Sequence, residues 1–425
     1  MRRTAWLVLL VSAVLMRPSL AETVADYGYP FVDPLEATVL GTPPPHKAEL
    51  PEEVPSEIHQ LVIYPRRPVP EIFWYTARFE YSLAAQPGRA PLVFVIPGTG
   101  ADYNAAKTLI MQRILYQAGL HVVSLTSPVH PNFVVSASST SVPGLITEDA
   151  EDLYRVMRLA YRQIGSRIDV SAFHLAGYSL GATEAAFVAR LDEEQKAFDF
   201  GRVLLINPPV NLYTSARVLD RLFDDNIRSE ADFNALFDSM MAALAGAFEQ
   251  TSPTTIDEDL LYAIYRTNPP DDATLEALIG LAFRFVEANL SFSADVMTNA
   301  GFIVPRGIEL STTDSLTPYL RIGLRTTFED YAREMLYPAY KATHPEVTFD
   351  EMIEAGSLRS IEEYLASSPK IGLMHNEDDI VLADGDIDYL KSLFGERARI
   401  YPKGGHNGNL DYRDNVADIM NFFKN

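Results

Sequence analysis

Residues 168–181 read IDVSAFHLAGYSLG, a stretch that combines a strand, a sharp turn and the start of a helix. Residues 168–176 are apolar enough for a buried strand, and residues 181–190 have helical spacing. Between them, residues 177–181 (GYSLG) match the G-x-S-x-G pattern. A sharp strand-to-helix turn lifts the serine oxygen clear of the sheet, and glycines permit close packing around it. We therefore interpret Ser179 as a candidate nucleophile; a buried serine in a tight turn is the alternative.

A serine nucleophile needs a base, and the base needs a third group that orients it. After a turn of this kind, an acid and then a histidine are expected, each behind a later strand. Residues 375–379 (HNEDD) follow one predicted strand, and His406 follows the last predicted strand at 397–401. We predict that Asp379 and His406 complete a catalytic triad with Ser179.

With these motifs the chain resembles the α/β-hydrolase superfamily over residues 57–210 and 366–425. The resemblance rests on the Ser179 turn, the strand that ends at residues 97–98 (PG), the Asp-rich turn and the Gly-Gly-His turn. The family usually has His-Gly where this chain has Pro-Gly. The resemblance implies a serine hydrolase with a large helical cap, and neither a metal nor an organic cofactor.

The same resemblance implies an oxyanion hole and selects the acid. The backbone N–H groups of Leu180 and Thr99 are expected to hold the negative charge that develops during attack. The family usually has a glycine three residues before the acid, where this chain has Asn376, and that spacing favours Asp379. Asp378 stays open as the alternative, because the proline that normally follows the acid is absent.

Alternating strand and helix patterns predict the fold class, α/β with a mostly parallel central sheet. Two antiparallel strands are predicted at residues 57–64 and 71–83, which are rich in β-branched and aromatic residues and in which apolar and polar residues alternate. The remaining strands are predicted at 92–96, 121–125, 168–176, 203–207, 370–374 and 397–401, and helices at 102–118, 147–164, 181–190, 386–394 and 411–424.

Residues 211–365 interrupt this alternation with patterns that are almost entirely helical. We predict a cap insertion that covers Ser179 and supplies an apolar pocket, so the expected substrate is a small molecule with an apolar part. The alternative is that these helices form their own core and leave the site open. Residues 275–290 predict a buried cap helix rather than a lid that contacts a membrane. Residues 22–56 are rich in Pro, Glu and Thr and predict an extended arm with little regular structure.

The first 21 residues have the three parts of a signal peptide: a basic start, an apolar core and small residues at 19 and 21. The apolar run is shorter than the roughly 20 residues that a membrane span needs. A membrane anchor is therefore the weaker interpretation. We predict cleavage after Ala21 and a secreted or periplasmic protein without a stable membrane anchor.

Composition excludes several classes of protein. The chain has no cysteine, so disulfides, cysteine hydrolases and thiolate metal sites are ruled out. The formal charge is −22, and removal of residues 1–21, with three arginines and no acid, makes it −25. Such a surface repels nucleic acid and anionic lipids. Residues 384–388 (DGDID) hint at calcium ligands but lack EF-hand spacing, so we interpret them as a helix N-terminus.

Taken together, the sequence predicts a secreted serine hydrolase that cleaves a carboxylic ester or thioester through an acyl-enzyme. An exported serine peptidase or amidase of the same fold is the first alternative, because the elbow is common to both. A catalytically silent hydrolase fold used for binding is the second. The oligomeric state is left open.

Overall fold

The fold is taken from a computed structural model that describes residues 21–25, 27–236, 238, 262, 265–266 and 269–424. Apart from Ala21, the predicted signal peptide lies outside the described residues and stays a prediction.

A nine-stranded sheet forms the centre of the described part of the chain, with strand order β1-β9-β8-β7-β6-β4-β5-β3-β2. The pairs β2–β3 and β3–β5 are antiparallel, and every other neighbouring pair is parallel. The predicted mostly parallel α/β sheet is therefore confirmed. The strands are β1 (Glu22–Thr23), β2 (Ser56–Leu61), β3 (Phe79–Ala84), β4 (Ala90–Ile96), β5 (His121–Ser124), β6 (Val170–Tyr178), β7 (Arg202–Ile206), β8 (Ile371–Asn376) and β9 (Ala398–Tyr401).

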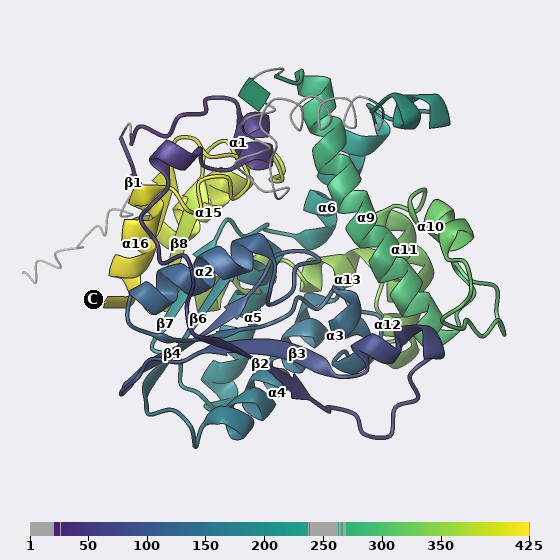
Figure 1. Cartoon of the computed structure of the whole chain (residues 1–425), viewed down its shortest axis with the longest axis horizontal. Coiled ribbons are helices and arrows are strands. Elements are labelled where there is room, and N and C mark those ends of the chain that lie inside the picture. The colour runs from purple at the N-terminus through teal and green to yellow at the C-terminus, as the bar shows by residue number, and fades with distance from the viewer. Residues whose placement is uncertain are drawn as a thin grey trace, which may run out of the picture.

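Helices cover the sheet and fill the long segment between β7 and β8 (Figure 1). The α-helices are α1 (Pro34–Leu40), α2 (Ala106–Gln117), α3 (Pro131–Ser136), α4 (Ile146–Ile164), α5 (Leu180–Gln195), α6 (Leu212–Asp224), α9 (Asp272–Thr298), α10 (Thr317–Gly323), α11 (Phe328–Tyr331), α12 (Tyr337–Thr343), α13 (Phe349–Ala355), α14 (Glu362–Ser367), α15 (Asp386–Phe394) and α16 (Arg413–Lys424). Shorter turns are η1 (Pro44–His46), η2 (Glu71–Thr76), η4 (Leu358–Ile361) and η5 (Gly395–Arg397), with a π-helical turn η3 (Ala332–Leu336).

The central strand β4 is apolar on both faces because both faces are covered. Leu92 and Phe94 belong to the core cluster shared with α4, α5 and α15. Val93 and Val95 belong to the opposite cluster, shared with α2 and α16 (Figure 1). Side chains that alternate between two helical layers explain why this strand has a continuous apolar run. The carboxyl ends of the parallel strands therefore meet at one edge, where the candidate site lies.

The predicted strand at 71–83 is only half correct, since β3 begins at Phe79 and residues 71–76 form the helical turn η2. Ile72 and Phe73 are both buried, whereas Trp74 and Tyr75 are both exposed. A strand covered on one face buries alternate side chains, and a strand covered on both faces, such as β4, buries successive ones. Two buried neighbours followed by two exposed ones fit neither pattern. The β-branched and aromatic composition was therefore a misleading signal here.

The segment predicted as an extended arm contains regular structure. β1 pairs in parallel with β9, and α1 follows with Asp33 as its N-cap and Pro34 in its first turn. The Asp33 side chain accepts a hydrogen bond from the N–H of Leu35 at 2.8 Å. An aspartate before a proline is a recognised helix start, and the high proline content obscured it.

Helices make up most of the described residues between β7 and β8, and α6 packs against the long helix α9 (Figure 1). The 27-residue helix α9 is long and apolar enough to cross a membrane by length and composition. However, 56% of its most apolar window is buried inside the protein, as in a core helix. Because β7 and β8 are parallel neighbours, the segment leaves the sheet at the carboxyl end of β7 and returns to the amino end of the adjacent strand β8.

Candidate active site

The turn between β6 and α5 holds Ser179 in a strained backbone conformation, with φ of 55°. Such a φ is costly for a residue with a side chain and persists only when its surroundings enforce it. A Cβ on Gly177 would lie 2.1 Å from the carbonyl oxygen of Gly181, and a Cβ on Gly181 would lie 2.2 Å from that of Ile96. The Ser179 N–H donates to the Ile206 carbonyl at 2.9 Å, which ties the turn to β7.

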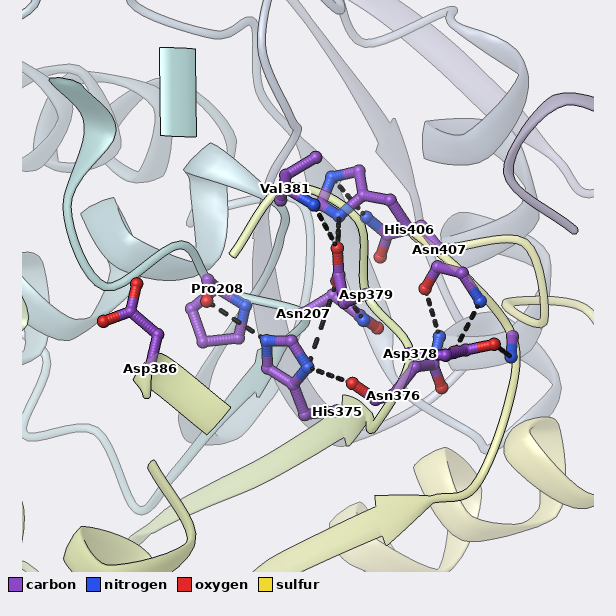
Figure 2. Close-up of polar contacts among 12 residues, drawn as sticks. Asn207, Pro208, His375, Asn376, Asp378, Asp379, Val381, Asp386, His406 and Asn407 are labelled. Atoms are coloured by element: carbon purple, nitrogen blue, oxygen red, sulfur yellow. Dashed lines mark hydrogen bonds and ion pairs between the residues drawn. The ribbon is translucent and has the colours of Figure 1, made fainter. Parts of the chain in front are cut away.

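The three residues predicted as a triad lie in one hydrogen-bonded chain. Ser179 Oγ is 2.8 Å from Nε2 of His406. Nδ1 of His406 is 3.0 Å from each carboxylate oxygen of Asp379 (Figure 2). Because Nδ1 faces a carboxylate, it carries the proton, and Nε2 is left as the acceptor for the serine hydroxyl. The three groups come from the ends of β6, β8 and β9, so the sheet edge brings them together.

Asp379 is buried and has two partners besides His406. The side-chain amide of Asn207 donates to Oδ2 at 2.7 Å, and the N–H of Val381 donates to Oδ1 at 3.1 Å. Burial alone would raise the pKa of Asp379, but neighbouring His406 and its hydrogen bond hold that pKa below its usual value. The carboxylate is thus charged and fixed in orientation, as needed to steady an imidazole.

Asp378, the alternative acid, has other partners. Its carboxylate accepts hydrogen bonds from the N–H groups of Gly404 and Gly405, at 3.2 and 2.9 Å. Burial raises the pKa of Asp378, and these two backbone bonds oppose that rise. Asp378 therefore shapes the loop that carries His406, whereas Asp379 contacts the imidazole itself (Figure 2).

The two residues predicted for the oxyanion hole lie beside the serine. Leu180 is the first residue of α5, a position whose N–H has no partner within the helix. Thr99 lies in the turn after β4 and lines the same cavity as Ser179. A Cβ on Gly98 would lie 3.0 Å from Cβ of Ser179, so this turn packs directly against the nucleophile position.

Three contacts to the triad were not predicted from the sequence. Thr38 on α1 accepts a hydrogen bond from the backbone N–H of His406 at 2.9 Å. Asn407 places Nδ2 3.1 Å from Nε2 of His406, with its own backbone at φ of 57°. Asn207, at φ of 48°, supports Asp379. The two asparagines directly follow a strand and a candidate base, which is a usable signal; Thr38 has no local signal.

His375 lies behind the acid and not in the cavity. It is fully buried, and its ring nitrogens lie 3.0 and 3.3 Å from the carbonyl oxygens of Asn376 and Pro208 (Figure 2). Burial lowers the pKa of His375, which favours the neutral ring. Residues 384–388 form the start of α15, and the described residues contain no cluster of three potential metal ligands.

A cavity of about 400 Å³ opens over Ser179 and His406. Helix α9 supplies one wall through Ile279, Phe283 and Val286, which share one face of the helix. Helix α6 adds Leu219. The segment between β7 and β8 therefore supplies apolar side chains to the cavity that contains the candidate nucleophile.

No family model and no curated protein sequence matches the chain. Several solved structures are similar in outline at low identity. An esterase from the archaeon Pyrobaculum calidifontis is 16% identical, with a TM-score of 0.41 over 88% of this chain and 86% of that one. A thermostable esterase from Pseudomonas putida ECU1011 is 14% identical, with a TM-score of 0.43 over 89% and 83%. A membrane phospholipase A is 18% identical, with a TM-score of 0.41 over 87% and 86%. Likenesses this distant carry no argument about activity.

Proposed function

We propose that this chain is a serine hydrolase of the α/β-hydrolase type that cleaves carboxylic esters or thioesters. The observation that carries the proposal is the chain of bonds from Ser179 through His406 to Asp379, at 2.8 and 3.0 Å. A catalytically silent binding protein has no need of a strained serine or of a charged acid behind its histidine. These features therefore favour catalysis over the binding alternative.

The proposed reaction runs through an acyl-enzyme. Ser179 attacks the carbonyl carbon while Nε2 of His406 takes the hydroxyl proton, and Asp379 steadies the imidazolium. The N–H groups of Leu180 and Thr99 hold the oxyanion. His406 then gives its proton to the leaving alcohol or thiol. In the second half, His406 removes a proton from water, which attacks the acyl-enzyme, releases the carboxylic acid and restores Ser179.

The cavity lining supports an apolar ester rather than a peptide. Among its described lining residues there is no acidic side chain, which an exopeptidase would use to hold a free amine. Lys107 and His406 are its basic residues, and alanines and the α9 side chains supply seven of the other fifteen described lining residues. We expect a substrate with a substantial apolar acyl or alcohol part; an exported peptidase or amidase is the second candidate.

Export belongs to the proposal because the signal-peptide pattern motivates it. The mature protein is expected to begin at Glu22, in the periplasm or outside the cell. N-terminal sequencing of protein from a secreting host tests this. An intact Met1 on a membrane-bound product would instead indicate an anchor.

The central experiment labels the enzyme with a fluorophosphonate probe, followed by turnover of p-nitrophenyl esters of increasing acyl length. Wild type is expected to be labelled at Ser179, and Ser179→Ala is expected to lose labelling and turnover with an unchanged melting temperature. Folded wild-type protein that is neither labelled nor active on esters or peptides would indicate a binding protein. Turnover of peptides in preference to esters would select the peptidase alternative.

A further inference from the structure

A second and larger cavity, of about 600 Å³, lies in the helical segment and shares no lining residue with the cavity over Ser179. Helices α6 and α9 contribute to both, but through different residues. Leu219 and Phe283 line the cavity over Ser179, whereas Phe223 and Arg284 line the second one. The two cavities are therefore neighbours that share the same pair of helices.

Positive charge gathers around the second cavity. Four arginines line it, at positions 228, 284, 321 and 325, against two acids, Asp224 and Glu230. The whole chain has the opposite balance, with 57 acidic and 35 basic residues. One surface arginine without an ion pair is ordinary, but three exposed arginines around one cavity in an acidic protein need an explanation.

Most of these arginines form no ion pair with an acidic side chain in the described part of the chain. Arg321 lies in α10 and Arg325 follows four residues later, just beyond the end of the helix, and neither side chain forms a hydrogen bond or ion pair with any described residue. Like charges at this spacing repel each other. The Nε of Arg228 donates a hydrogen bond to the Asp225 carbonyl. Its two terminal nitrogens form no hydrogen bond or ion pair with a residue in the described part of the chain. An anion would relieve the repulsion between these guanidinium groups.

Arg284 anchors the cavity from inside. It is 2% exposed, and its Nη2 lies 2.7 Å from Asp220 and 3.2 Å from Asp224. Its Nε lies 3.3 Å from the equally buried carboxyl group of Glu287. Arg284 is therefore already paired with three carboxyl groups, and the arginines that remain open to a ligand are the exposed ones at 228, 321 and 325.

The other described lining residues are mostly apolar, with Ser229 and Asn234 as the polar ones. Phe223, Ile227, Phe233 and Leu324 lie among the arginines. The volume falls within the range of sites for small organic ligands. Guanidinium groups match the two oxygens of a carboxylate in geometry, and the apolar side chains match a hydrocarbon body.

We propose that this cavity is a second binding site, for an organic carboxylate with an apolar tail. Arg321 and Arg325 hold the carboxylate, and Phe223 and Leu324 contact the tail. The proposal rests on the charge, lining and volume of the second cavity, and it holds whether or not Ser179 is a nucleophile.

Isothermal titration calorimetry of the full protein with octanoate tests the site, with octylamine and inorganic phosphate as comparison ligands. Octanoate is expected to bind one site per chain, and octylamine is expected not to bind. The double variant Arg321→Gln/Arg325→Gln is expected to weaken octanoate binding at least tenfold. The matched control is Arg190→Gln, which removes an exposed arginine on α5 outside both cavities and should change affinity less than twofold.

Melting temperatures of both variants confirm that they are folded before binding is compared. If octanoate binds both variants as tightly as wild type, it binds at another place, for example beside Ser179. This outcome overturns the assignment. Equal weakening in the double variant and the control indicates general electrostatics and also overturns it. Phosphate that binds as tightly as octanoate rules out the organic carboxylate.

Discussion

Asp378 and Asp379 are neighbours in sequence, yet they contact different atoms of the same loop. Asp379 faces the imidazole of His406, and Asp378 holds the backbone of Gly404 and Gly405. The two carboxylates therefore leave the turn after β8 in different directions. The sequence left both aspartates open as the acid of the triad. In the structure Asp379 orients the imidazole, and Asp378 holds the loop that carries it.

Asp379→Asn is expected to lower turnover by about 10⁴, because an amide cannot stabilise the imidazolium that forms during attack. Asp378→Asn keeps one acceptor oxygen for the loop and is expected to cost far less. The measurement is kcat/KM of both variants on a p-nitrophenyl ester. A larger loss in Asp378→Asn than in Asp379→Asn would move the triad to the other acid.

At the scale of elements, α1 comes from a segment far from the triad in sequence but lies against the loop that carries the base. A Cβ on Gly405 would lie 2.3 Å from the carbonyl oxygen of Pro34, and one on Gly408 would lie 2.0 Å from that of Ala37. These glycines exist because α1 and the loop touch at the backbone. Together with the bond from Thr38, the contact makes α1 part of the site.

Thr38→Val keeps the shape of this side chain but removes the oxygen that accepts from the N–H of His406. The unsatisfied N–H is expected to cost about 1–3 kcal/mol in free energy of unfolding. Turnover should fall about fivefold to tenfold as the base loses its fixed position. Thr38→Ser retains the hydroxyl and is the matched control. Urea unfolding and ester kinetics measure the two effects, and identical values for all three proteins would exclude a role for α1.

The sequence was most informative where one residue type is needed for a local reason. The turn around Ser179 and the sheet strands on either side of it were predictable, because glycine spacing and apolar runs are local signals. Thr38 was not, since it reaches His406 across 368 positions of sequence. The helical turn at 71–76 was also mistaken for a strand, because burial by the distant segment at 303–310 decides its conformation.

Helix α9 presses on the turn that supplies the predicted oxyanion donor Thr99. Gly100 has φ of 69°, and a Cβ there would lie 2.5 Å from Cγ1 of Val286. Helix and turn are therefore in direct contact, and the position of one constrains the other.

Gly100→Ala is expected to slow fluorophosphonate labelling at least a hundredfold, because the new methyl displaces the turn from α9. Val286→Ala alone removes the two methyl groups that the new Cβ at position 100 would meet, and it should change the labelling rate only slightly. In the double variant, labelling should recover in part, limited by the strain of a positive φ, about 1–3 kcal/mol. Strictly additive effects in this cycle would mean that α9 does not set the turn.

On the scale of the whole molecule, acidic residues outnumber basic ones, and some of their carboxyl groups are buried in the core. Glu184 on α5 is fully buried, and neither of its oxygens has a hydrogen-bond partner among the described residues. Burial, with a smaller contribution from Asp149, raises the pKa of Glu184 well above its usual value. Glu193, on the same helix, is half-exposed and pairs with Lys196 and Lys370, which lower its pKa to about 2.

These two glutamates are expected to change stability with pH in opposite directions. In the unfolded chain Glu184 loses its proton above about pH 4.3, whereas the folded protein retains it. The folded state then binds more protons, so stability falls as pH rises, by up to about 1.4 kcal/mol per pH unit, until the folded pKa is reached. Glu184→Gln removes this loss, so it should match wild type near pH 4 and exceed it increasingly up to pH 8.

Glu193→Gln is the control of opposite sign on the same helix. The lowered pKa of Glu193 gives stability that is present above its unfolded pKa and is lost as pH falls toward 2. Its replacement should therefore weaken the protein at pH 7, with a difference from wild type that shrinks in acid. Urea unfolding of the three proteins between pH 4 and 8 gives the free energies. A Glu184→Gln difference that does not vary with pH would mean that this buried carboxyl is ionised in the folded protein, despite having no partner for its charge.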